Sequence, residues 1–340
     1  MLHLATNSRG GLVSARATAR ANIALAKYWG KSDVRRNLPA VPSVSITLNE
    51  LVTQTEVSFD PSLTQDRFVL DGSVAAWRQQ ERVVELLDRV RDKARLAHKA
   101  IVTSDNRFPT AAGLASSASG FAALAAAATR AAGLTLGQRE VSALARRSSA
   151  SAARSVYGGF VVLEAGTPGD DSLAAEPLAP ADHWDVRLVL AFTESGPKTV
   201  SSTEAMERSR KTSPYYDAWL SSAPGWSETV KQAIRKRDLE SLGEAMEQST
   251  LAFHCCAITS RPSTLYWGSG TMAALHKVAQ LRREGIPVWS TMDAGPHVKA
   301  LCEAKDAPLV RDALEQTPGV LGTLISSPGA ESSVESGHSE

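Results

Sequence analysis

Residues 109–118, PTAAGLASSA, decide how this sequence folds and what it can hold. Pro109 and Gly113 break regular structure just before an Ala-rich segment, which we expect to be a helix over residues 114–132. A loop of small residues lets an anion approach the backbone, and a helix start offers unpaired N–H groups and a positive dipole end. The stretch therefore suits a polyphosphate held at a helix N-terminus.

The hydroxyls of Ser116 and Ser117 stand at this helix start and allow two interpretations. They add hydrogen-bond donors for a phosphate, or one of them simply caps a buried helix. The residues alone leave both alternatives open. A P-loop is excluded, because residues 29–32 (WGKS) hold only the end of that motif, and Leu25 stands where its first glycine is required.

The composition is that of an ordinary globular protein, with 43% hydrophobic and 21% charged residues among 340. This length allows one large or two modest domains. Because the formal net charge is only +1, no global basic field recruits nucleic acid or an anionic membrane. We therefore expect small anionic ligands bound by local clusters of donors, with no nucleic-acid or membrane partner.

Three cysteines, Cys255, Cys256 and Cys302, indicate reduced thiols, since an odd count with two adjacent does not suggest a disulfide framework. Residues 254–256 are too tightly bunched to wrap a zinc ion, so no metal site made of side chains is predicted. We find no signal peptide and no apolar stretch long enough to span a bilayer. These features predict a cytoplasmic protein.

Strand and helix patterns alternate without strict βαβ order, which favours an α+β fold. Alternating apolar residues predict a strand or hairpin over residues 43–59, and an apolar stripe predicts a helix over residues 81–95. We expect two domains, residues 15–190 and 191–328. Residues 329–340 are rich in Ser, Glu and Gly without an apolar period, and so predict a disordered tail.

Two further segments carry cations beside small polar residues. Lys27 and Lys31 flank Tyr28 and Trp29, where they can meet phosphate or carboxylate, or form a solvated pair. In residues 148–154 (SSASAAR), the serines and the arginine can ring an anion, and an Arg fork suits a planar carboxylate. A helix terminus with a surface arginine is the alternative.

An acid stands directly after a predicted strand, in residues 291–296 (TMDAGP). Asp293 can take a proton from a hydroxyl there, or serve only as a turn or N-cap residue. Taken together, a phosphate loop, several anion binders and one candidate base fit phosphoryl transfer, in which positioning and charge neutralisation do most of the catalysis.

The sequence resembles the diphosphomevalonate decarboxylases of the GHMP kinase superfamily, from about residue 17 to residue 329. Five motifs carry the resemblance in order: NIALAKYWGK (22–31), FPTAAGLASSASGFAAL (108–124), SASAARSVYGGF (149–160), VSSTEAM (200–206) and TMDAGP (291–296). The resemblance implies a two-domain GHMP kinase fold, with a ribosomal-protein-S5-domain-2-like N-terminal domain and a ferredoxin-like C-terminal domain. It also implies a homodimer.

The resemblance further implies that the enzyme binds ATP with Mg²⁺ and the acidic substrate diphosphomevalonate. The residues it assigns to ATP are Pro109, Ala112, Gly113, Leu114, Ala115, Ser116 and Ser117. The residues it assigns to the substrate are Tyr28, Trp29, Gly30, Lys31, Arg82, Ser149, Ala150, Ser151, Ala152, Ala153, Arg154, Thr203 and Met206.

Four residues receive catalytic roles from the resemblance. Asp293 would take the proton of the C3 hydroxyl, Ser117 would orient the β- and γ-phosphates, Arg154 would grip the C1 carboxylate, and Lys27 would neutralise charge. The implied reaction converts (R)-5-diphosphomevalonate and ATP to isopentenyl diphosphate, ADP, phosphate and CO₂. That step belongs to the mevalonate pathway of isoprenoid biosynthesis.

Several positions depart from the family pattern. They are Val41 and Pro42, Ala150, His297 and residues 254–256. Because they border the implied pocket, a phosphomevalonate decarboxylase and a mevalonate 3-kinase-like enzyme stay as alternatives, together with an inactive homologue that only binds. The joint presence of Lys27, Arg154 and Asp293 favours decarboxylation.

Overall fold

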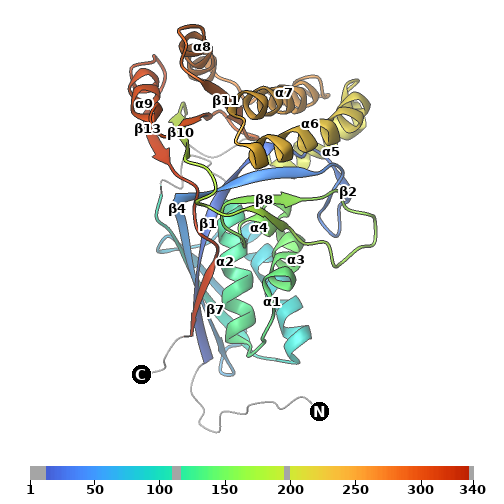
Figure 1. Cartoon of the computed structure of the whole chain (residues 1–340). Helices are drawn as coiled ribbons and strands as arrows, with labels where there is room; N and C mark the ends of the chain where they lie inside the picture. Colours follow the sequence, from blue (N-terminus) through green and yellow to red (C-terminus); the bar gives the residue numbers. More distant parts are fainter. Residues whose placement is uncertain (1–12, 109–115, 195–199, 337–340) are drawn as a thin grey trace.

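The computed structural model describes residues 13–108, 116–194 and 200–336, and it contains two main sheets (Figure 1). The larger sheet has the strand order β14-β1-β4-β7-β5-β6, with β8 and β9 attached beside β4, and the smaller has the order β11-β12-β10-β13. Helices accompany both sheets, so the predicted α+β fold is confirmed.

The N-terminal domain is built on two long strands, β1 (Val13–Ala26) and β4 (Ser43–Asp60), which pair antiparallel. The other strands of this domain are β2 (Lys31–Asp33), β3 (Leu38–Pro39), β5 (Arg67–Leu70), β6 (Ser73–Val74), β7 (Lys99–Asn106), β8 (Phe160–Leu163) and β9 (Glu176–Ala179). Its helices are α1 (Trp77–Ala94), α2 (Ser116–Ala131), α3 (Gln138–Ser148) and α4 (Ala150–Arg154).

Small side chains let α2 lie close against this sheet (Figure 1). Alanines alternate with polar residues along β1, and Ala15, Ala17 and Ala19 are buried in the same core as the alanines of α2. Because the facing residues of α2 and β1 are mostly alanines, helix and strand approach closely, and the start of α2 lies near the end of β1. The alternation along β1 has the period of two expected of a strand with one buried face.

The C-terminal domain is a four-stranded antiparallel sheet covered on both faces. Its strands are β10 (Val186–Phe192), β11 (Val288–Met292), β12 (Val298–Glu303) and β13 (Gly322–Ser326). Its helices are α5 (Ser202–Thr212), α6 (Tyr216–Lys236), α7 (Leu239–Ile258), α8 (Ser269–Arg283) and α9 (Ala307–Glu315). None of the helices in the described ranges is both long and apolar enough to cross a membrane.

The two domains share one hydrophobic core. Along β10, Val189 and Ala191 pack with α8 and α9, whereas Leu188 and Leu190 pack with α6, α7 and residues of β1 and β4 such as Ile23. A strand buried on both faces reads as a continuous apolar run, which explains the sequence VRLVLAF. The shared core holds the end of β1 against the C-terminal domain.

The structure differs from the expected domain bounds at two places. The boundary between residues 190 and 191 falls inside β10, which pairs with β12 and β13, so the N-terminal domain ends before Val186. The tail at 329–340 was expected to be disordered, but Ser333–Ser336 form β14 on β1, with Val334 opposite Ala17. The edge of β1 offers unpaired backbone groups that this polar segment satisfies. Residues 337–340 lie outside the described residues.

Candidate active site

A cavity of about 140 Å³ lies where the two domains meet, and we call it the polar cavity for the three charged side chains in its wall. It is lined by residues from the end of β1, the starts of α2 and α5, the short helix α4, the helix α7 and the turn after β11: Asn22, Ala24, Lys27, Tyr28, Trp29, Ser117, Ser151, Arg154, Ser202, Met206, Phe253, Asp293 and Ala294. The polar cavity thus gathers the four predicted catalytic residues from segments far apart in the sequence.

Two buried lysines hold the carboxylate of Asp293. Lys27 Nζ lies 2.8 Å from Oδ1, and Lys299 Nζ lies 3.3 Å from Oδ2. The Asp293 side chain is 30% exposed, whereas each lysine side chain is 4% exposed. Burial lowers the pKa of Lys27 to about 8, although the neighbouring carboxylate opposes this shift. The carboxylate is therefore the part of this group that a ligand can reach.

Arg154 is buried beside neutral partners. Its Nη1 donates to Ser43 Oγ at 2.7 Å, its Nε donates to Asn22 Oδ1 at 3.3 Å, and its guanidinium lies 6.0 Å from the Tyr28 ring centroid. Burial lowers the pKa of Arg154 to about 10, a value that still leaves it charged at neutral pH. A buried cation held by neutral groups in a cavity wall is suited to receive an anion.

Of the five residues predicted at 149–153, the structure places some at the polar cavity and some in the core. Ser151 lines the cavity, and its hydroxyl lies 3.0 Å from that of Ser149. Ala150, Ala152 and Ala153 are buried in the N-terminal core instead. Their small side chains let α4 pack tightly, which fixes Arg154 at its end.

Lys31 lies outside the wall of the polar cavity, near the start of α5. Its Nζ donates to Thr203 Oγ1 at 3.1 Å, and burial together with the nearby charge of Arg82 lowers its pKa to about 8. Gly30, just before it, has φ +108°, and a Cβ there would lie 1.9 Å from the Tyr216 hydroxyl oxygen. Only glycine fits this turn, because of both the backbone conformation and the close approach.

Trp29 and Met206 close the polar cavity with apolar surface. The Trp29 ring lies 5.0 Å from that of Phe253, and its carbonyl accepts a 2.8 Å hydrogen bond from Trp219 Nε1. Val41, one of the departures from the family pattern, is buried in the same hydrophobic cluster as Trp29 and Met206. The departure therefore affects the packing behind the cavity wall.

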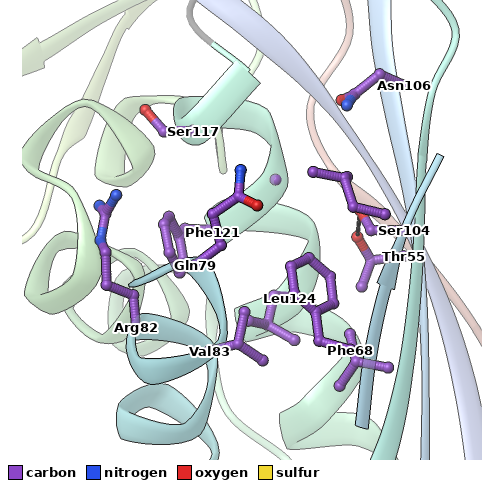
Figure 2. A pocket seen from close by; sticks show the side chains of 13 residues that line it. Thr55, Phe68, Gln79, Arg82, Val83, Ser104, Asn106, Ser117, Phe121 and Leu124 are labelled. Atoms are coloured by element: carbon purple, nitrogen blue, oxygen red, sulfur yellow. Dashed lines mark hydrogen bonds between the residues drawn. The ribbon is translucent and has the colours of Figure 1, made fainter. Parts of the chain in front are cut away.

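A second cavity of about 110 Å³, which we call the apolar cavity for its six aromatic and aliphatic lining residues, lies between α1, α2 and the sheet (Figure 2). Its apolar lining is Phe68, Leu70, Val83, Val102, Phe121 and Leu124, and its polar lining is Thr55, Gln79, Arg82, Ser104, Asn106, Ser117 and Gly120. Ser117 lines both cavities, at the N-terminal turn of α2. The two cavities therefore adjoin at Ser117.

Arg82 lines the apolar cavity and not the polar one, although it was predicted beside the substrate diphosphate. Its guanidinium lies 4.5 Å from the Phe121 ring centroid, and Nη2 donates to the Ser148 carbonyl at 2.7 Å. Burial lowers the pKa of Lys31 and the positive charge of Arg82 adds to this shift, whereas burial raises the pKa of Tyr28 and the same charge opposes that rise. Arg82 thus lines the apolar cavity, while its charge reaches residues that were predicted to bind the substrate.

Most of the predicted ATP loop lies outside the described residues, namely Pro109, Ala112, Gly113, Leu114 and Ala115. Ser116 begins α2, and its side chain is also outside the description. Ser117 is thus the residue of this loop that the structure places in the wall of both cavities.

Sequence reasoning missed four residues that shape the polar cavity: Asn22, Ser43, Ser202 and Lys299. Lys299 had a signal, since a lysine inside the apolar run VKALC is unusual. His297, a departure from the family pattern, lies behind the turn, where Nδ1 accepts from the Thr193 N–H at 3.2 Å.

His254 is a buried histidine next to this site. Its ring packs against Phe253, Tyr266 and Trp267 and lies beside the backbone of Asp293. Burial lowers its pKa to about 3, so the ring is neutral at physiological pH. It contributes volume to the wall near Asp293 and no charge.

Comparison with known proteins identifies the family. Residues 19–174 match the diphosphomevalonate decarboxylase-like N-terminal domain, and residues 188–323 match the mevalonate 5-diphosphate decarboxylase C-terminal domain. The chain is 35% identical over 302 residues to the diphosphomevalonate decarboxylase of Candida albicans, covering 84% of this chain and 83% of that one. It is 33% identical over 286 residues to the phosphomevalonate decarboxylase of Haloferax volcanii, covering 83% and 87%.

Solved structures agree over almost the whole chain. The mevalonate diphosphate decarboxylase of Staphylococcus aureus has a TM-score of 0.90 at 36% identity, covering 95% of this chain and 98% of that one. A complex of MDDEF with MVAPP, AMPPCP and magnesium has a TM-score of 0.90 at 38% identity, covering 96% and 100%. The predicted resemblance is confirmed: the chain belongs to the diphosphomevalonate decarboxylase family.

Proposed function

We propose that this enzyme catalyses the ATP-dependent decarboxylation of diphosphomevalonate to isopentenyl diphosphate. The observation that carries the proposal is the meeting of Asp293, Lys27 and Arg154 in one cavity that opens to Ser117 at the start of α2. One carboxylate and several cations around a small volume suit a substrate with a hydroxyl and negative charges at both ends. Similar proteins with this activity span nearly the whole chain.

The groups in the polar cavity fit an order of events. Asp293 accepts the proton of the C3 hydroxyl as the hydroxyl oxygen receives the γ-phosphoryl group of ATP and ADP leaves. Lys27 neutralises the negative charge that develops. Arg154 holds the C1 carboxylate. The C3–O bond then breaks with loss of phosphate, the C1–C2 bond breaks with loss of CO₂, and the released electron pair forms the C2–C3 double bond.

The nucleotide fits the pair of cavities. The apolar cavity offers side-chain amides of Gln79 and Asn106 beside apolar walls, as a planar nucleoside base requires, and Ser117 stands where phosphates would pass. Within the described residues no three His, Cys, Asp or Glu side chains come together to hold a metal. Mg²⁺ typically keeps phosphates and waters as ligands, so the nucleotide would supply most of its shell, with the Ser117 hydroxyl within the same site.

We infer two further properties: a homodimer, which the family resemblance implies, and a cytoplasmic location, which the lack of a signal peptide and of a long apolar stretch in the sequence predicts. Sedimentation velocity at micromolar concentration tests the first, with a single species near twice the 36.1 kDa chain mass as the expected result. Fractionation of the source cells tests the second.

The decisive experiment compares substrates. The protein is incubated with ATP, Mg²⁺ and either diphosphomevalonate or phosphomevalonate carrying a label at C1, and ADP and labelled CO₂ are measured separately. We expect equal release of both products with the diphosphate. ADP without CO₂ would show a kinase, faster turnover of the monophosphate would identify a phosphomevalonate decarboxylase, and no ADP from either would leave only a binding protein.

A further inference from the structure

Lys299 is a buried lysine that the proposed reaction has not yet used. It is the second residue of β12, opposite Leu190 of β10 and Thr291 of β11. Its neighbours Val298 and Ala300 point to the α8 and α9 face, so Lys299 points to the other face, toward β1 and α7. Lysines are almost never fully buried unless they are paired, and this one is 4% exposed.

The ammonium of Lys299 has two acceptors, and both belong to the turn that carries Asp293. Nζ lies 3.3 Å from Asp293 Oδ2 and donates to the His297 carbonyl at 3.3 Å. The lysine therefore ties both ends of the turn between β11 and β12 to the same point. Lys27 approaches the other carboxylate oxygen from β1, at 2.8 Å.

The charges that face Asp293 come from four packed elements. Lys27 is at the end of β1, Lys299 on β12, Arg154 on α4 and His254 on α7. The first three are cationic, and His254 is neutral at physiological pH. A single carboxylate thus faces a surplus of positive charge, which favours its ionised form.

We propose that Lys299 is a positioning residue for the proposed reaction, because it holds Asp293 ionised and oriented before substrate arrives. A carboxylate has about four acceptor positions, so one contact on each oxygen leaves others for a substrate hydroxyl. Contacts on both oxygens also restrict rotation of the carboxylate. This orientation matters because a base must be aligned with the hydroxyl whose proton it accepts. The inference rests on the proposed function for its kinetic consequences, and on the ion pairs alone for the state of Asp293.

The test compares Lys299→Met, Lys299→Arg and Lys305→Met. Lys305 is a matched control, since it is 72% exposed and pairs with Glu303 at the surface just after β12. We expect Lys299→Met to lower kcat by about 10- to 10²-fold and to move the acidic limb of kcat/KM upward by about one pH unit or more, since removal of an adjacent cation raises a carboxyl pKa by that amount. Lys299→Arg should return the acidic limb of kcat/KM to the pH found for the unmodified protein. Lys305→Met should change neither kcat nor the position of this limb.

A merely structural role for Lys299 gives a different result. Lys299→Met would then lower the melting temperature and leave the acidic limb unchanged, which would overturn the proposal. The variant is expected to fold, because Lys27 and Asp293 still form a one-to-one ion pair without Lys299.

A measurement on the unmodified, unliganded protein keeps the test valid even if the variant does not fold. Carboxyl ¹³C NMR with aspartate labelling, assigned by Asp293→Asn, reports the state of Asp293 directly. We expect its signal to keep the ionised shift at about pH 4, where an ordinary aspartate is near half protonated. Half protonation of Asp293 at that pH would overturn the proposal, whereas an ionised Asp293 in a protein without ATP turnover would reject the proposed function alone.

Discussion

The polar and apolar cavities differ in how the chain builds them, although they share Ser117. The apolar cavity is made entirely by the N-terminal domain, from α1, α2, β4, β5 and β7. The polar cavity takes Lys27 and Arg154 from that domain and Asp293 from the other. An uncharged ring can be bound by apolar walls and a few amide groups, which one domain supplies. A reacting group that carries negative charge needs several cations and a base around it, and these come from both domains.

The two cavities also differ in the number of cations in their walls, which are Lys27 and Arg154 in the polar cavity and Arg82 in the apolar cavity. Burial lowers the pKa of Lys27 to about 8 and that of Arg154 to about 10, so the folded protein holds cations where water solvates them poorly. An anionic ligand that enters the polar cavity relieves this cost, whereas a ligand in the apolar cavity gains mainly from removing apolar surface from water. Four predictions separate the cavities, from the largest expected effect to the smallest.

Loss of the base should have the largest effect. We expect Asp293→Asn to lower kcat by about 10²- to 10⁴-fold, the usual contribution of a positioned base, while ATP and substrate still bind. Steady-state kinetics with calorimetric binding measures both. Asp185→Asn, at an exposed aspartate paired with Arg187, is the matched control and should keep full turnover. Near-normal turnover in Asp293→Asn would show that the base lies elsewhere.

Loss of the buried arginine should come next. Arg154→Ala removes the cation proposed to hold the substrate carboxylate, and truncating one partner of a buried charge pair costs about 2–5 kcal/mol. We therefore expect kcat/KM for the acidic substrate to fall about 10²-fold, with ATP affinity nearly unchanged. Arg139→Ala, at a surface arginine paired with Glu176, is the control. A loss of nucleotide affinity alone would mean that Arg154 serves the apolar cavity.

Filling the apolar cavity should have the converse effect. Gly120 lines it, and a Cβ there would meet no described atom within 4 Å, so the side chain of Gly120→Leu would occupy the cavity. We expect the KM for ATP to rise about tenfold, since overpacking costs about 1–3 kcal/mol. The KM for the acidic substrate should hold. Gly225→Leu, on the exposed face of α6, should change neither constant, and a rise in the acidic KM instead would place the nucleotide elsewhere.

The smallest effect is a pH dependence that belongs to the polar cavity alone. Lys27 faces Asp293, Lys299, Arg154 and His254, and its pKa is lowered to about 8. If turnover needs the ammonium, kcat should fall by about half at pH 8 and further above it. The pKa of Lys31 is also lowered to about 8, so Lys31→Arg is the control. This variant should still show the fall of kcat near pH 8.

Protein stability should move in the opposite direction over the same range. The unfolded chain keeps the Lys27 proton up to its ordinary pKa of 10.5, whereas the folded state releases it at about 8. Between these values the unfolded state binds more protons, so this lysine's contribution makes the free energy of unfolding rise with pH. Activity that falls together with the melting temperature would contradict the assignment, because unfolding would then explain the loss.

Much of the fold was predictable from local patterns. The helix expected over residues 81–95 is α1, and the strand or hairpin expected over residues 43–59 is the single strand β4. Strand β1 was harder to predict because its buried positions are alanines, which have low β-propensity. Strand β12 is short and contains Lys299, and for that reason the second lysine at Asp293 was missed.

The sequence by itself determined the local chemistry: the helix start at Ser116 and Ser117, the Gly-Pro turn after Asp293 and the family to which they belong. Tertiary structure decided which of these groups meet. Lys27 and Asp293 are 266 positions apart, and their ion pair exists because β1 packs into the core of the second domain. Tertiary structure also placed β14 on β1 and Lys299 on the second carboxylate oxygen. The physical reason is that propensity and hydrophobic period act over a few residues, whereas a buried charge is stabilised only by partners that the folded chain brings to it.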